Sequence, residues 1–232
     1  MNKDNDYSLL SQGMFPFLML NPEISRLFRE ISIYDFDPKL PKTAVSMTGK
    51  RELEENGSNL SIVLKSIIDS SKDRKKLISL VKDVLPFVEN LNVNNVAGKY
   101  LLFNMREVFN QKEYPASLIS DGTINVIALI TALYFEDHPI IFIEEPERNM
   151  HPHLMSKVVD ILRNASSKKQ IFVTTHNPEV VRCTGLDSLL LIKRDKDGYS
   201  KFIKPKENEA EVKNFLENDI GLDDLYINEL LG

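Results

Sequence analysis

The stretch Ile140-Ile-Phe-Ile-Glu-Glu-Pro-Glu147 decides the fold class. Its four consecutive apolar residues are typical of a parallel strand that is covered on both faces. Two acidic residues, Glu144 and Glu145, follow directly, where such a strand would end. In open α/β sheets, ligands bind at the carboxyl ends of the strands. The stretch therefore predicts a buried strand that delivers carboxylates to a ligand site, although a strand followed by a solvated acidic turn would give the same pattern.

Helices and strands alternate around this stretch, from residue 116 to residue 205. Proline suits the first turn of a helix, and Pro152 stands where a helix is expected to begin. Helix, strand, helix and strand in this order imply right-handed crossovers and a parallel sheet. The turn sequence Asp195-Lys-Asp-Gly198 predicts a hairpin. The predicted elements are helices over 123–135 and 152–164, buried strands over 140–143 and 170–175, and further strands over 188–194 and 199–204.

The part of the chain before residue 116 has a different sequence pattern, in which short apolar runs are mixed with polar helices. Its predicted elements are strands over 31–37 and 100–109 and helices over 59–70 and 75–84. We therefore predict an α/β fold in three parts. An α+β subdomain over 1–115 precedes an α/β lobe over 116–205, and a polar, helical tail follows over 206–232.

Composition narrows the class of protein. The chain has 232 residues, 42% of them hydrophobic, a net charge of −5 and a single cysteine, Cys183. It has no apolar run long enough for a membrane span and no secretory signal, so we expect a cytoplasmic protein with no membrane partner and no intramolecular disulfide. The net charge gives no support for nucleic-acid binding. The basic run Lys72–Lys76 is either a solvated helix start or a local nucleic-acid patch.

A polar group follows the next predicted strand, in Thr174-Thr-His-Asn-Pro178. If the two strands are parallel neighbours, His176 ends beside the carboxylates Glu144 and Glu145 and faces the same ligand. An isolated histidine is more often structural or simply exposed. The acidic strand upstream favours a functional role for His176.

The segment Leu118-Ile-Ser-Asp-Gly-Thr123 opens the apolar helix expected over 123–135. Ser120 or Asp121 suits the N-cap of that helix. Unpaired backbone N–H groups at a helix start also bind anions such as phosphate. The local chemistry is the same for a plain cap and for a phosphate site, so this segment alone does not choose between them.

Taken together, four motifs resemble those of the overcoming-lysogenisation-defect and RecF-like ATPases, in the SMC-like branch of the ABC ATPases. They are Ser120-Asp-Gly-Thr123, Glu144-Glu-Pro-Glu147, Asn149-Met-His-Pro-His153 and Thr174-Thr-His-Asn-Pro178, and the stretch Leu53–Leu60 adds to them. The resemblance covers most of residues 30–195. It implies the C-terminal lobe of a P-loop NTPase head of the ABC/SMC-like kind, with ATP and Mg²⁺ as cofactors.

The resemblance also implies a role for each matching residue. Glu144 would serve Mg²⁺, Glu145 would be the catalytic carboxylate of a Walker B motif, and His176 would sense the γ-phosphate. Ser120 and Gly122, in the signature motif, would contact ATP held by the opposite protomer of a homodimer, and Asn149–His153 would be the D-loop along the interface. The cofactor-binding residues are accordingly Ser120, Asp121, Gly122, Thr123, Asn149 and His151.

The sequence departs from this family pattern in one serious respect. A phosphate-binding P-loop needs Gly, four residues and then Gly-Lys-Ser/Thr, but Gly49-Lys50 and Gly98-Lys99 are followed by Arg51 and Tyr100. The loop would lie before Met1, so we expect a truncated chain, one part of a split protein or a degenerate remnant, whose partner is an N-terminal P-loop half. A smaller departure is Glu144 itself, where ABC proteins usually carry Asp.

The implied function is ATP hydrolysis at a composite dimer interface, in DNA repair or phage defence. This chain alone, without a P-loop, is expected to be inactive. One alternative is a non-hydrolysing, ATPase-like module for dimerisation or docking. Another is the ATPase partner of a separate nuclease effector. DNA itself is a further possible partner.

Overall fold

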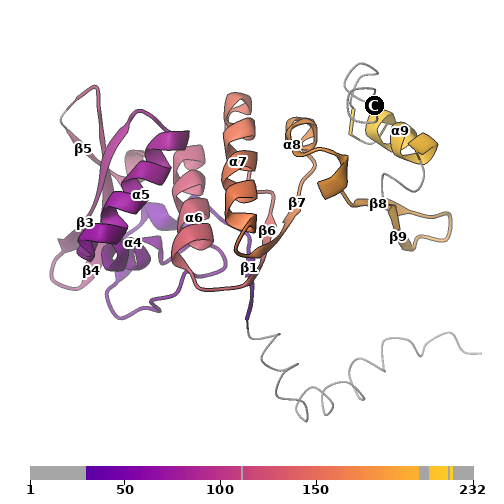
Figure 1. The fold of residues 1–232 in the computed structure, drawn as a ribbon. Helices are drawn as coiled ribbons and strands as arrows, with labels where there is room; N and C mark the ends of the chain where they lie inside the picture. Colours follow the sequence, from indigo (N-terminus) through magenta and orange to yellow (C-terminus); the bar gives the residue numbers. More distant parts are fainter. Residues whose placement is uncertain (1–29, 111, 204–208, 219, 222–232) are drawn as a thin grey trace, which may run out of the picture.

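The structure is a computed structural model, which describes residues 30–110, 112–203, 209–218 and 220–221. Within these residues the strands form three sheets (Figure 1). The first sheet is parallel, in the order β1 (Ile31–Tyr34), β6 (Ile140–Glu144) and β7 (Gln170–Thr174). The second is antiparallel and contains β2 (Val45–Ser46), β3 (Val88–Val96), β4 (Tyr100–Glu107) and β5 (Glu113–Pro115). The third is the hairpin of β8 (Leu191–Arg194) and β9 (Ser200–Ile203).

Six α-helices accompany these sheets in the described part of the chain. Helices α4 and α5 lie with the antiparallel sheet at one end of the molecule, α6 and α7 stand in the middle, and α9 lies near the β8–β9 hairpin at the other end (Figure 1). Their bounds are α4 (Leu60–Asp69), α5 (Ser71–Val84), α6 (Asp121–Phe135), α7 (Met155–Ser166), α8 (Pro178–Thr184) and α9 (Glu209–Asn218).

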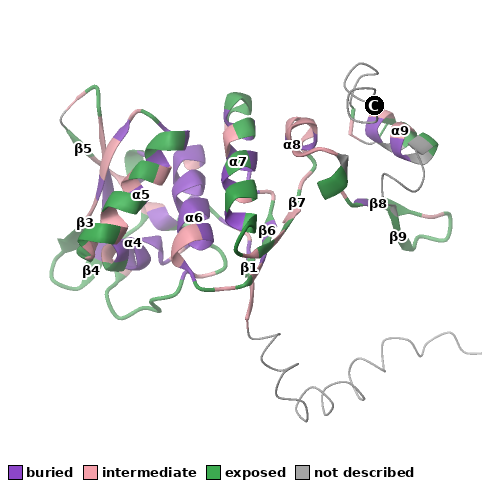
Figure 2. Cartoon of the chain, viewed as in Figure 1, coloured by how far each residue is buried: buried purple, intermediate pink, exposed green. Residues whose placement is uncertain are grey.

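Helix α6 is the centre of the main hydrophobic core. Every residue from Gly122 to Leu133 is buried, as a helix that is apolar nearly all round requires (Figure 2). Its apolar side chains share one cluster with residues of α4, α5 and α7 and with residues of the parallel and the antiparallel sheet. Each fully buried Leu or Ile of this cluster contributes about 1.5–3 kcal/mol. The cluster includes residues from both sides of position 115, so the core does not separate the first two predicted parts. Their boundary stays a prediction.

Within the described residues, the parallel sheet is covered on one face and open on the other. On β6, Ile141 and Ile143 are buried in the main core, whereas Phe142 between them is 37% exposed. Phe142 pairs in register with Ile33 of β1 and Phe172 of β7, which are 52% and 43% exposed. The rings of Phe142 and Phe172 stack with their centroids 4.5 Å apart. We call these three residues the open apolar row.

The open apolar row corrects two predictions. Residues 140–143 were expected to be covered on both faces, and residues 170–175 were expected to form a buried strand. Instead, burial alternates along β6, and β7 shows only intermediate and exposed residues in the order exposed, intermediate, exposed, intermediate, exposed. The reason is that helices α6 and α7 pack on one side of the sheet only, so alternate side chains remain in contact with solvent.

Several boundaries differ from those predicted. Helix α5 begins at Ser71 rather than Lys75, because the Ser70 side chain caps it by accepting a hydrogen bond from the Asp73 backbone N–H at 3.3 Å. The helix expected from Pro152 begins as a 3-10 turn, Pro152–Leu154, before α7 starts at Met155. Strand β3, which forms a hairpin with β4, was not predicted. The apolar segment Phe15–Leu20 and most of the predicted tail lie outside the described residues.

Helix α9 falls within the tail predicted to be helical, and it buries Val212 and Leu216 against Val181 and Leu191. No helix in the described part of the chain is long and apolar enough to cross a membrane.

Candidate functional site

The carboxyl ends of the three parallel strands bring the predicted site residues Glu144, Glu145 and His176 to one edge. Pairing of β6 with β7 places Glu144 opposite Thr174, and the backbone N–H of Glu145 donates to the Thr174 carbonyl at 3.0 Å. His176 follows two residues after β7 ends and is exposed. Asp35 follows β1 directly at the same edge. These residues come from three segments that lie far apart in the sequence.

The two neighbouring glutamates, Glu144 and Glu145, differ in environment. Glu144 is exposed and lies on the same face of β6 as Phe142, because side chains alternate along a strand. Glu145 turns out of the strand with a φ of 39°, in the left-handed region that non-glycine residues rarely adopt. Strained backbone of this kind gathers at functional sites, where the surrounding structure maintains it.

Arg148 connects the ends of β6 and β1. Its Nε donates to Glu145 Oε2 at 3.2 Å, and its Nη1 donates to Asp35 Oδ1 at 2.9 Å. All three side chains are partly exposed, with 37–44% of their surface accessible, so the two ion pairs contribute little to stability. Their effect is to hold the Glu145 carboxylate in one orientation. Neither Arg148 nor Asp35 was among the predicted site residues.

Glu147 is the buried acid of the turn after β6. Its Oε1 accepts a hydrogen bond from the Thr175 hydroxyl, while its Oε2 is buried without a hydrogen-bond partner among the described residues. Burial raises the pKa of the Glu147 carboxyl, and the Thr175 hydrogen bond and the charge of His176 act in the opposite direction. The Thr175 Oγ1 also accepts from the Asn177 backbone N–H at 3.0 Å. Glu147 therefore fixes the turn after β6 to the segment that carries His176.

The predicted signature motif, Ser120–Thr123, forms the capped start of α6. Ser120 Oγ accepts from the Thr123 backbone N–H at 3.2 Å and donates to Thr123 Oγ1 at 2.8 Å. Asp121 forms an ion pair with Lys42 at 2.5 Å. The sequence had left Ser120 and Asp121 as alternatives for the N-cap, and the structure assigns this position to Ser120.

The predicted D-loop lies against the start of α6. A Cβ added to Gly122 would be 2.6 Å from the Asn149 carbonyl oxygen, so only glycine permits this approach. Asn149 itself has a φ of 64°. From the next turn of α6, Asn125 Nδ2 donates to the Arg148 carbonyl at 2.7 Å. Two contacts from one helix thus position the chain that follows Glu145.

Five of the predicted residues line one pocket of about 420 Å³. They are Ser120, Gly122, Thr123, Asn149 and His151, and Phe87, His153 and Lys157 are among the other lining residues. Glu144, Glu145 and His176 do not line it. The predicted site is therefore divided into a pocket at the start of α6 and a carboxylate edge at the end of β6.

One family accounts for most of the chain. Residues 2–182 match the family described as "AAA domain, putative AbiEii toxin, Type IV TA system". The chain belongs to this family. This AAA domain is thereby related to the ABC- and SMC-like ATPases, as the motifs indicated; its finer placement with the overcoming-lysogenisation-defect and RecF-like branch stays a prediction.

Curated relatives of the AAA domain include two kinds of protein. It is 23% identical to the chromosome partition protein Smc of Fusobacterium nucleatum, in an alignment covering 69% of this chain and 16% of that protein. It is 30% identical over 109 residues to the Septu protein PtuA of Bacillus mycoides, covering 42% of this chain and 15% of that protein. The chain thus spans less than a fifth of the length of these relatives.

Solved structures show the same fold. One solved structure comes from a study of the ATP-driven dimerization and DNA-stimulated activation of SMC ATPases. Its match covers 67% of this chain and 96% of that structure's chain, with a TM-score of 0.50 and 12% identity. The Smc head domain of Pyrococcus yayanosii matches 60% of this chain, with a TM-score of 0.47 and 17% identity. The first likeness confirms an α/β fold resembling SMC heads, with a parallel and an antiparallel sheet.

The carboxylate edge of the AAA domain fits Mg²⁺ as half of a site. Mg²⁺ is usually held by one or two carboxylates together with the phosphates of a nucleotide, rather than by a cage made of protein alone. Glu144 is an exposed carboxylate in a suitable place, and no group of three potential metal ligands occurs among the described residues. His151 and His153 contact each other through their Nδ1 atoms at 2.6 Å but have no third ligand.

Sequence reasoning missed Asp35, Arg148 and Thr175. Thr175 stands inside the polar group that marked His176, and Asp35 stands near the carboxyl end of the strand predicted over 31–37, as Glu144 stands at the carboxyl end of β6. These two carried a detectable signal. Arg148 carried none, because its importance depends on a contact between residues 113 positions apart.

Proposed function

We propose that this AAA domain supplies one half of a composite ATP-hydrolysing site, and that a segment bearing a P-loop supplies the other half. The observation that carries the proposal is the position of Glu144 beside the open apolar row, two residues after Phe142 on β6. Phe142 and Glu144 share one face of β6, and Ile33 and Phe172 extend that face across the sheet. A P-loop half that covers the row would bring its phosphate-binding loop beside Glu144.

Each residue of the carboxylate edge then has a role. Glu144 would hold Mg²⁺, which supplies positive charge to neutralise the transferring phosphoryl group. Glu145 would orient the attacking water, and His176 would contact the γ-phosphate. Since Arg148 holds Glu145 toward Asp35, the assembled site would use Glu145 either in this orientation or after release from Arg148.

The pocket at the start of α6 is proposed to contact ATP bound to a second copy of the domain. Helix starts bind anions through unpaired backbone N–H groups and the helix dipole. Ser120, Asp121, Gly122 and Thr123 form such a start, and Asn149 and His151 add polar groups from the D-loop. The separation of this pocket from the carboxylate edge supports a homodimer, in which each nucleotide touches the pocket of one copy and the edge of the other.

The similarity to PtuA, a Septu protein, supports a role in phage defence. A cytoplasmic location and a separate nuclease effector accord with that role. The similarity to Smc supports chromosome maintenance or DNA repair as the alternative cellular setting.

A second function, as a docking module that does not hydrolyse ATP, is favoured by one observation. The 232 residues contain no Gly-x4-Gly-Lys-Ser/Thr sequence. Under this alternative, the open apolar row and the α6 pocket would bind partners, and Glu145 would carry no catalytic function.

The deciding experiment measures Mg²⁺-dependent ATP hydrolysis by this chain alone and together with the polypeptide that bears the P-loop. Activity in the mixture that is abolished by Glu145→Gln and retained by Glu107→Gln, a matched change on β4, would support the composite ATPase. Absence of hydrolysis in every combination, with a P-loop polypeptide that is folded and binds ATP, would favour the docking module.

A further inference from the structure

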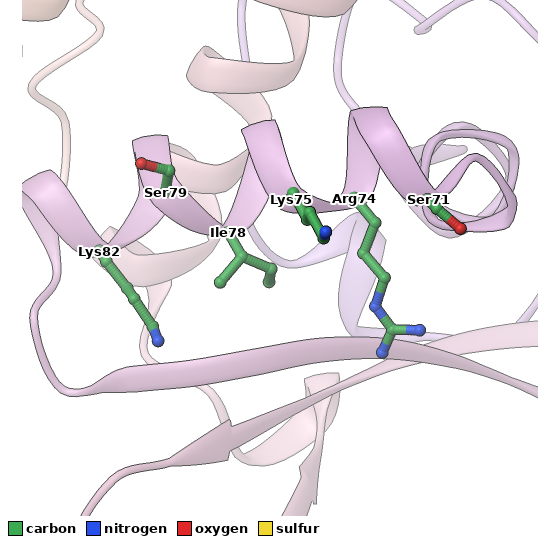
Figure 3. Close-up of a pocket in the computed structure, with 6 residues that line it drawn as sticks. All are labelled: Ser71, Arg74, Lys75, Ile78, Ser79 and Lys82. Atoms are coloured by element: carbon green, nitrogen blue, oxygen red, sulfur yellow. The ribbon is translucent and has the colours of Figure 1, made fainter.

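A basic pocket of about 580 Å³ lies along α5, and none of its lining residues lines the α6 pocket, which the last residue of α5, Val84, borders. Six residues of this one helix line it, and Figure 3 shows their side chains. Three are cationic, two carry hydroxyl groups and one is apolar. They are Arg74, Lys75, Lys82, Ser71, Ser79 and Ile78.

The charge of α5 is opposite to that of the whole chain. Ser71–Val84 contains five basic and two acidic residues, giving the helix a charge of +3, whereas the complete chain has −5. The rest of the chain is therefore acidic, and α5 is a local concentration of positive charge. Such a concentration creates a potential that attracts polyanions even when the net charge of the protein is negative.

No carboxylate in the part of the chain that the structure describes forms an ion pair with the pocket cations. Arg74 Nη2 donates to Asn92 Oδ1 at 2.8 Å and to Asn90 Oδ1 at 3.3 Å, so neutral amides orient the guanidinium without cancelling its charge. The nearby carboxylate of Glu113 accepts from the amide of Asn92 instead. Among the described residues, Lys75 and Lys82 form no ion pair.

Lys76, on the same helix, differs from the pocket lysines because it contacts other residues of the protein. It donates to the Tyr134 carbonyl at 2.9 Å and lies 4.7 Å from the centre of the Phe135 ring. This lysine stabilises the packing of α5 on α6. Lys75 and Lys82 have no comparable contact in the described part of the chain, and both are exposed.

The spacing of the cations suits an extended ligand. Arg74, Ile78 and Lys82 follow one another at intervals of four residues and extend to the same side of α5 (Figure 3). Eight residues of helix place Arg74 and Lys82 about 12 Å apart. Their side chains run side by side rather than converging on one point, so successive phosphates of a strand fit them better than a single phosphate ion.

We propose that this face of α5 binds the phosphate backbone of a nucleic-acid strand without reading its sequence. Arg, Lys and Ser are usual donors to backbone phosphates, and Ile78 offers an apolar contact between the cations. No aromatic side chain lines the pocket, so the stacking that ordinarily holds single-stranded bases is not provided by these lining residues.

The test measures binding of the full chain to a fluorescently labelled oligothymidylate of about 20 nucleotides, by anisotropy at several salt concentrations. The variant Lys75→Gln/Lys82→Gln is expected to bind about 10-fold more weakly at low salt. Its slope of log affinity against log salt should be smaller by about 1.4, since each lost phosphate contact removes about 0.7. Both lysines are exposed, and circular dichroism verifies that the variant is folded.

The matched control is Lys168→Gln/Lys193→Gln, which removes two exposed positive charges elsewhere on the surface. Equal weakening by this control would overturn the proposal, because the effect would then arise from overall charge. Polyglutamate that competes as effectively as unlabelled oligothymidylate would also overturn the proposal, because the ligand would then be an acidic protein segment. Inorganic phosphate that competes as effectively, at equal phosphate concentration, would overturn it as well. Binding is measured without ATP, so the outcome does not depend on the proposed ATPase.

Discussion

Gly122 and Asn149 approach each other so closely that a Cβ on the glycine would lie 2.6 Å from the asparagine's carbonyl oxygen. The same added atom would lie 3.3 Å from the Cα of Met150. Both neighbours are backbone atoms, which cannot move aside as the end of a flexible side chain can. The start of α6 and the predicted D-loop are therefore mutually positioned by the absence of a side chain.

Replacing this glycine by alanine should reverse the usual effect of that substitution. In a helix, Gly→Ala ordinarily stabilises by about 0.5–1 kcal/mol. For Gly122→Ala we expect the free energy of unfolding, measured by urea denaturation, to fall by about 1–3 kcal/mol because the D-loop must shift. The comparison is Gly49→Ala, whose added Cβ would approach closely only the Ile62 Cδ1 atom, at the end of a flexible side chain, while the Ser46 carbonyl oxygen stays at an ordinary contact distance of 3.5 Å. A cost for Gly122→Ala no larger than for Gly49→Ala would contradict this interpretation.

The open apolar row should be detectable in solution. Phe172 is 43% exposed and stacks on Phe142, and an apolar fluorescent dye is expected to bind where the two rings and Ile33 form a continuous surface. The substitution Phe172→Ser should lower dye fluorescence markedly. Phe109→Ser, which removes an aromatic ring that is 83% exposed elsewhere, should lower it little. Equal effects of the two substitutions would mean that the row does not act as one surface.

The sequence predicted the elements of the α/β lobe well because their signals are local. The apolar run before Glu144, the all-round apolar pattern of α6 and the turn Asp195-Lys-Asp-Gly198 each depend on residues close together in the chain. Strand β3 was missed because Val88–Val96 contains four asparagines, and its pairing with β4 rather than its own composition makes it a strand.

The candidate site was predictable as a set of motifs but not as an arrangement. Glu144 and His176 could be placed at one edge because parallel strands end together. That Ser120 and Asn149 share a pocket separate from Glu145 depends on how tightly α6 packs on the D-loop, which spacing alone does not reveal. The open face of β6 was also hidden, because the run Ile140–Ile143 is equally apolar at covered and uncovered positions.

The buried carboxyl of Glu147 should make stability depend on pH. Burial raises its pKa above the usual 4.5 in the folded state, so the folded chain binds this proton more tightly than the unfolded chain does. The contribution of the protonated form is present below the unfolded pKa and is lost as pH rises through the folded value. The free energy of unfolding of the natural protein should thus fall, relative to that of Glu147→Gln, from about pH 4.5 upward.

Urea denaturation at a series of pH values measures this difference. Gln at this position retains an acceptor for the Thr175 hydroxyl, so Glu147→Gln isolates the charge. Glu136, whose pKa burial also raises, is present in both proteins and cancels in the comparison. A difference that stays constant between pH 4 and pH 7, or one that grows in favour of the natural protein, would contradict the assignment.

The catalytic and the structural interpretations of Glu145 make opposite predictions about stability. Its ion pair with Arg148 is partly exposed, and such pairs contribute about 0.2–1 kcal/mol. Glu145→Gln should therefore lower the free energy of unfolding by less than about 1 kcal/mol in urea denaturation, as should Arg148→Gln. The double variant measures the coupling between the two side chains, which should weaken further in high salt. A loss of about 3 kcal/mol or more from Glu145→Gln would show that this carboxylate is needed for folding, and its effect on hydrolysis would then say nothing about catalysis.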